Sequence, residues 1–146
     1  MSFNPYVPCN CVKEGKTNWP SYKEKLEIRN GLIDVKFEFI DIDNLVDKFD
    51  SHKLCDHNQI AIEFSMSQSI IGWREHVQIK YPNRFPNFIV FIPTANDSFN
   101  HDYDKLKTVE EIEILKTLEE EKYHERLDQF INLLVKAIEL NQEIYW

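Results

Sequence analysis

The sequence predicts a mainly helical α+β fold, organised as a single domain over residues 1–146. The chain has 146 residues, of which 42% are hydrophobic and 13% aromatic, as expected for one globular domain. Asn30-Gly31 marks a β-hairpin, and apolar residues recur at spacings of three and four through residues 108–146. We therefore expect an N-terminal coil and hairpin packed on a helical core, with a long C-terminal helix or helices.

Residues 1–23 are expected to form a coil. Pro5, Pro8 and Pro20 interrupt both helical and ladder hydrogen bonding, and Gly15 lies between them. A segment of this kind must be held in place by something outside itself.

Residues 24–40 are expected to form the hairpin. Asn30 and Gly31 tolerate the positive φ that both central positions of a two-residue turn require. Apolar residues suited to strands lie on both sides of this turn, namely Leu26, Ile28, Leu32, Val35, Phe37 and Phe39.

Residues 41–82 are expected to be helical, beginning with a short amphipathic segment. Asp41 or Asp43 can cap its start, and its apolar positions run to Leu54. Cys55 and His57 then lie at the end of this helix or in the turn after it.

Two further helices are expected in the same region. Residues 60–64 resemble the start of one helix, and Ser67 or Ser69 can cap another. Pro82 would end the second of these, because proline lacks the backbone donor that a helix needs.

Residues 83–104 contain an apolar run followed by a loop. Residues 85–92 have the composition of a strand, yet their length also fits a short buried helix. Residues 94–104 are rich in Asn and Asp and are expected to form the loop.

Residues 105–146 show the clearest helical pattern. Thr108 and Glu111 match a capping box, in which each side chain would bond the other residue's backbone amide. No Gly or Pro follows Thr108, so one long helix and two helices with a bend near Tyr123 both fit, and drift of the apolar positions favours the bend. The acidic run Glu119-Glu120-Glu121 is expected to lie on a solvated face.

All three cysteines and one histidine fall in two short clusters. Cys9 and Cys11 form the first, and Cys55 and His57 form the second. Three thiolates and one imidazole are the ligand set of a closed tetrahedral zinc site, in which no position remains for water. The sequence thus predicts a structural zinc ion that ties the N-terminal coil to the middle of the chain.

Two other interpretations of these residues remain open. Reduced cysteines are often small buried hydrophobic residues, with His57 then lying at the surface on its own account. A redox-active dithiol formed by Cys9 and Cys11 is the other, although it leaves Cys55 and His57 without a role.

Composition and motifs exclude several classes of function. A net charge of −8 argues against nucleic acid, because phosphate binding needs clustered Lys and Arg. No apolar run is long enough to cross a membrane, and the proline-containing N-terminus does not resemble a signal peptide, so we expect a cytoplasmic protein with reduced thiols. Gly15-Lys16-Thr17 resembles the end of a phosphate-binding loop, but Asn10 stands where that motif requires glycine.

The residues Tyr6-Val7-Pro8-Cys9-Asn10-Cys11 and Glu14-Gly15-Lys16 are similar to the opening of a family of small uncharacterised bacterial proteins. The family also has a later Cys-x-His pair, here Cys55 and His57, and a segment that resembles residues 85–96. The resemblance implies the metal site and a helical conformation for residues 85–92, and it implies no reaction.

We expect a non-enzymatic, protein-binding role of an immunity or regulatory type, with another protein as the partner. The acidic composition, the lack of a catalytic constellation and the closed ligand set favour this role. The alternative is a small metal-dependent enzyme in which one of Cys9, Cys11 or His57 is not a ligand and water takes its position. The sequence predicts no oligomeric state.

Overall fold

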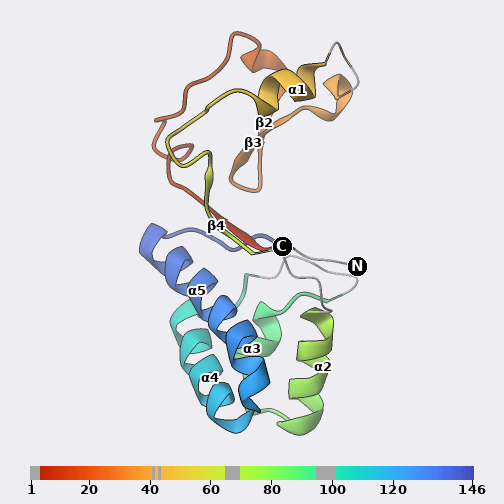
Figure 1. Cartoon of the computed structure of the whole chain (residues 1–146), viewed down its shortest axis with the longest axis vertical. Coiled ribbons are helices and arrows are strands. Elements are labelled where there is room, and N and C mark those ends of the chain that lie inside the picture. The colour runs from red at the N-terminus through yellow and green to blue at the C-terminus, as the bar shows by residue number, and fades with distance from the viewer. Residues whose placement is uncertain (1–3, 41, 43, 65–69, 95–100) are drawn as a thin grey trace. The chain divides into compact units, whose positions relative to one another are not determined.

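The computed structural model describes residues 4–40, 42, 44–64, 70–94 and 101–146. About 48% of the described residues are helical, which confirms a mainly helical α+β fold. The chain divides into two compact units, a small unit of residues 8–61 and a helical unit of residues 1–7 and 62–146 (Figure 1). The single domain over residues 1–146 stays a prediction, and each unit is described by itself.

The predicted hairpin is confirmed in the small unit. Strand β2 (Leu26–Arg29) pairs antiparallel with β3 (Leu32–Val35), and Arg29 lies opposite Leu32. Asn30 and Gly31 have φ of 53° and 76°, the left-handed conformation that this two-residue turn requires. The Asn30-Gly31 pair therefore sets the conformation of the turn and the register of β2 against β3.

Short helices surround the hairpin. The 3₁₀ helices η1 (Lys23–Lys25) and η2 (Phe37–Phe39) flank it, and α1 (Leu45–Asp50) follows. Asn44, at φ 57°, precedes α1, whereas the expected caps Asp41 and Asp43 lie outside the described residues. The core of this unit consists of Leu26, Ile33, Val35, Leu45 and Leu54.

A second sheet pairs β1 (Tyr6–Pro8) with β4 (Ile60–Glu63). The expectation of a helix over residues 60–64 is wrong. Asn58 and Gln59 precede β4 with φ of 50° and 68°, so neither residue can belong to a right-handed helix. β4 also has β1 as a hydrogen-bonding partner, a long-range pairing that local composition does not reveal.

The helical unit contains α2 (Ile70–Lys80), α3 (Pro86–Phe91), α4 (Lys105–Leu118) and α5 (His124–Leu140). These four helices pack in sequence order, with α2 on α3, α3 on α4 and α4 on α5 (Figure 1). The ambiguous apolar run is thus the helix α3, with Pro86 in its first turn, where a missing N–H costs nothing. Ser67 and Ser69, the expected caps of α2, lie outside the described residues.

The predicted bend between the two C-terminal helices is confirmed, but the predicted capping residue is wrong. η3 (Glu121–Tyr123) separates α4 from α5. Asp104, not Thr108, caps α4, because its side chain accepts a hydrogen bond from the Lys107 amide at 2.9 Å. Thr108 lies inside the helix, and its hydroxyl donates to the Asp104 carbonyl at 2.7 Å.

The core of the helical unit is rich in aromatic rings. Phe88, Phe91 and Phe130 are almost completely buried and contact one another at centroid distances of 5.7 to 6.4 Å. Among the described helices, none has the length and apolar character needed to cross a membrane.

Candidate metal centre

The first pair of candidate ligands lies in a tight turn that follows β1. The Lys16 amide donates to the Cys11 carbonyl at 2.8 Å, and the Glu14 amide donates to the Asn10 carbonyl at 2.9 Å. Gly15 closes this turn with φ of 68°, a conformation that glycine adopts without steric cost. Two cysteines two positions apart are thereby held on a folded-back backbone.

The second pair lies in a turn between α1 and β4, as the sequence predicted. The Asn58 amide donates to the Cys55 carbonyl at 3.1 Å, and the Ile60 amide to the His57 carbonyl at 3.3 Å. The two turns are joined nearby, since the Asn18 amide donates to the Leu54 carbonyl at 2.8 Å.

Gln59 connects both turns to the hairpin. Its amide donates to Cys55 Sγ at 3.0 Å, and its carbonyl accepts from the Cys9 amide at 3.0 Å. Its side-chain Oε1 accepts from the Ile33 amide of β3 at 2.7 Å, and the residue is only 4% exposed. Sequence reasoning missed this residue, because an isolated glutamine gives no signal that it is buried.

The four predicted ligands are brought together. One ligand atom from each of Cys9, Cys11, Cys55 and His57 lies within 4.8 Å of the other three, which is close enough to bind a metal ion. Cys9 Sγ is 3.7 Å from Cys55 Sγ, and Cys11 Sγ is 3.5 Å from His57 Nδ1. None of the three cysteines forms a disulfide, which would place its sulfurs at about 2 Å.

Burial differs across the cluster. Cys9 and Cys55 are 4% and 5% exposed, Cys11 is half-buried and His57 is exposed. One side of the cluster thus faces the protein and the other faces solvent.

The thiols also differ electrostatically. Burial raises the pKa of Cys11 to about 12, and hydrogen bonds with Cys9 and Cys55 add to the rise. Burial acts in the same direction on Cys55, but hydrogen bonds outweigh it, chiefly from the Gln59 amide, so the pKa of Cys55 is lowered. Backbone amides therefore favour the thiolate at Cys55, the form in which cysteine binds metal.

Other residues singled out in the sequence have structural roles. Lys16, in the loop-like Gly15-Lys16-Thr17 segment, pairs with Glu14 at 2.9 Å. Glu119 corrects the expectation of a solvated acidic face, because its side chain is 1% exposed and lies 2.7 Å from His76 and 3.6 Å from Lys80.

Comparisons with protein-family models, with curated proteins and with solved structures find no match for this chain. The resemblance of residues 6–96 to an uncharacterised bacterial family stays a prediction.

Proposed function

We propose that Cys9, Cys11, Cys55 and His57 bind one zinc ion as a closed structural centre, and that the protein has a non-enzymatic, protein-binding role of an immunity or regulatory type. Four protein ligands occupy all the coordination positions of a tetrahedral zinc ion. No position remains for the water that hydrolytic catalysis uses. A site of this composition stabilises a fold and supplies no reaction.

The spacing of the ligand atoms supports the zinc proposal most directly. In a tetrahedral site with Zn–S of about 2.3 Å and Zn–N of about 2.0 Å, the S···S edge is about 3.8 Å and the S···N edge about 3.5 Å. The Cys9–Cys55 and Cys11–His57 separations of 3.7 and 3.5 Å match these two edges. The ligand set also suits zinc, because thiolate and imidazole are its preferred partners.

The small unit is of a size at which a metal centre can contribute much of the stability. Its core has five buried apolar residues among those described, and the core of a unit this small rarely supplies more than about 3–5 kcal/mol. Zinc binding to Cys and His sites contributes on the order of 10 kcal/mol of apparent free energy at neutral pH. That contribution is large enough to decide whether residues 8–61 are folded.

A partner-binding surface is suggested by exposed apolar side chains next to the hairpin. Phe37 is 83% exposed and Ile40 is 40% exposed. They are three positions apart around the 3₁₀ helix η2, so both side chains point to the same side. Exposed aromatic residues of this kind are frequent in protein interfaces.

The zinc proposal is tested by metal analysis and by X-ray absorption at the zinc edge. We expect one zinc per chain with three sulfur and one nitrogen neighbours. Fully folded protein with no bound metal would contradict the proposal.

The protein-binding proposal is tested by recovery of a partner from the native host. We expect Phe37→Ser to lose a partner that the unchanged protein retains. Ile79→Ser is the matched control, because Ile79 is 82% exposed but lies on α2. Equal recovery with both variants would move the interface away from η2.

The alternative, a metal-dependent enzyme, is favoured by one observation. The Cys11 and His57 side of the cluster reaches solvent, so loss of either ligand would admit water. X-ray absorption separates the two proposals, since an oxygen neighbour in place of one sulfur or nitrogen supports the enzyme.

A further inference from the structure

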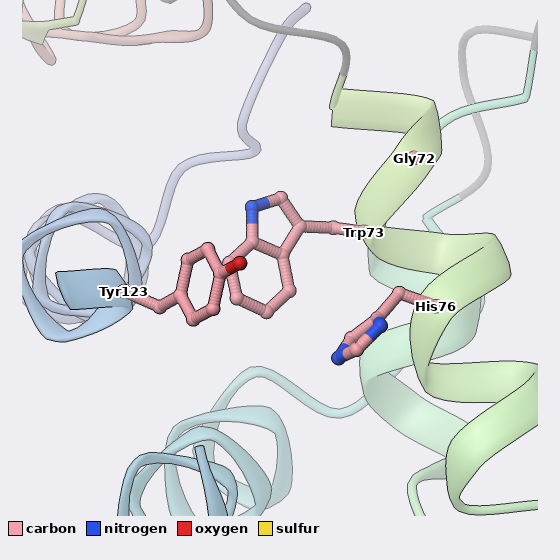
Figure 2. Close-up of a pocket in the computed structure, with 4 residues that line it drawn as sticks. All are labelled: Gly72, Trp73, His76 and Tyr123. Carbon is pink, nitrogen blue, oxygen red and sulfur yellow. The ribbon is translucent and has the colours of Figure 1, made fainter. Parts of the chain in front are cut away.

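The helical unit has a hollow of about 220 Å³. The residues that line it are distant in sequence from the cysteine cluster. Gly72, Trp73 and His76 line it from α2, and Tyr123 lines it from η3 (Figure 2). The Tyr123 and His76 rings each stand edge-on to Trp73, at centroid distances of 5.3 and 5.8 Å. The result is a recess with flat aromatic walls.

A second hollow of about 420 Å³ shares Trp73 and Tyr123 with the first. Its polar lining includes the exposed carboxylate Glu125 and the three residues Lys122, Arg126 and Gln129. These three residues are four and three positions apart along η3 and α5, so they lie on one helix face. The aromatic recess therefore continues into a polar compartment lined by two cationic side chains and one carboxylate.

Two residues that line this compartment each have a side-chain atom without a hydrogen-bond partner among the described residues. Arg126 Nη1 and Gln129 Oε1 are screened from solvent, and neither has a hydrogen-bond partner among the described residues. Lys122, by contrast, pairs with Glu120 at 3.3 Å. A screened donor or acceptor without a partner is costly and is rare in native proteins, so each such atom needs an explanation.

The other wall of the recess is held in place from inside. Glu119 is 1% exposed at its side chain, and its two oxygens lie 2.7 Å from His76 Nε2 and 3.6 Å from Lys80 Nζ. This buried carboxylate fixes the orientation of the imidazole, whose side chain is 42% exposed. A recess with a fixed wall binds a ligand with less loss of entropy than a mobile one.

We propose that the two hollows form one binding site for a small planar organic anion. The ring system lies against Trp73 and Tyr123, an anionic group accepts from Arg126, and a neighbouring N–H or O–H of the ligand donates to Gln129. An arginine fork suits a planar anionic group, and aromatic rings pair favourably at offset or edge-on geometry.

Indole-2-carboxylate is a suitable probe, because its ring N–H is adjacent to its carboxylate. Two close analogues each lack one feature: indole-2-carboxamide has no charge, and benzofuran-2-carboxylate has no N–H. Binding is measured by ¹H–¹⁵N NMR on the full chain, with the Trp73 indole signal identified from Trp73→Phe. We expect the amide to bind about tenfold more weakly, the usual size of a charge-assisted hydrogen bond.

The matched variants are Arg126→Gln and Lys136→Gln, which remove one positive charge from different faces of α5. We expect Arg126→Gln to abolish the preference for carboxylate over amide, and Lys136→Gln to retain it. Equal binding of the carboxylate and the amide to the unchanged protein overturns the proposal, as does no Trp73 shift at about 10 mM probe. These two readouts use the unchanged chain, so they decide the question even if Arg126→Gln fails to fold. None of them depends on zinc, so their outcome is independent of the proposed metal centre.

Discussion

Replacement of Gln59 by alanine tests whether one buried side chain supports the metal centre. The register of the hairpin explains why Ile33 needs this partner. Arg29 and Leu32 flank the two-residue turn, so the next pair, Ile28 and Ile33, is a non-hydrogen-bonded one. The Ile33 amide therefore points away from β2, and Gln59 Oε1 accepts from it at 2.7 Å.

The expected magnitude follows from this single bond. Gln59→Ala leaves the buried Ile33 amide without an acceptor, which costs about 1–3 kcal/mol. The backbone hydrogen bonds of Gln59 to Cys9 and Cys55 do not depend on its side chain. Because zinc binding and folding of such small units are coupled, the same free energy weakens zinc affinity by roughly five- to 150-fold.

Gln59→Gly separates the side-chain effect from the backbone effect. Gln59 has φ of 68°, and a left-handed conformation costs a non-glycine residue roughly 1–2 kcal/mol. Glycine loses the same hydrogen bond but relieves this cost, so we expect its stability to lie between those of the unchanged protein and Gln59→Ala.

The assay is competition for zinc with a chromophoric chelator, combined with urea unfolding followed at the Trp19 indole. Gln78→Ala serves as the control, because Gln78 is exposed on α2. We expect its effect to stay within about 0.5 kcal/mol. Zinc affinity that is unchanged in Gln59→Ala would refute the argument that Gln59 supports the centre.

Three further predictions concern other parts of the chain. Cys55→Ser or chelation should lower the melting temperature and expose residues 8–23 to limited proteolysis, and cleavage that stays as slow as before would contradict a clamp. Asp104→Ala should destabilise the protein by about 0.5–2 kcal/mol in urea unfolding, and an unchanged free energy of unfolding would contradict the cap. Burial, aided by Glu143, raises the pKa of Tyr103, so the unfolded state loses its proton first and stability should fall above about pH 10. Tyr103→Phe should reduce that alkaline loss, and an unchanged pH profile would assign it to other groups.

Local chemistry made part of the fold predictable. Asn30-Gly31 requires a left-handed turn whatever surrounds it, and the break near Tyr123 followed from drift of the apolar positions. The four candidate ligands were also predictable, because cysteine and histidine are metal ligands by residue type. Each of these features depends on residues that are close in sequence or on residue type alone.

Features that depend on long-range partners were not predictable. Ile60–Glu63 forms a strand because β1 is available to pair with it. Glu119 is buried because His76 and Lys80, about forty positions earlier, reach its carboxylate. Gln59 is the same kind of case at the candidate site, since its three partners come from three separate segments.

The positions of the ligands along the chain explain why a metal would be effective here. Cys9 and Cys11 follow β1, whereas Cys55 and His57 precede β4, so the two pairs lie near the start and the end of the small unit. Ligands 46 positions apart close most of that unit into a loop. Closing such a loop removes roughly 4 kcal/mol of chain entropy from the unfolded state, by the relation used for disulfides. A single ion near the base of the loop thus acts on every residue between the two turns, including the hairpin that Gln59 joins to them.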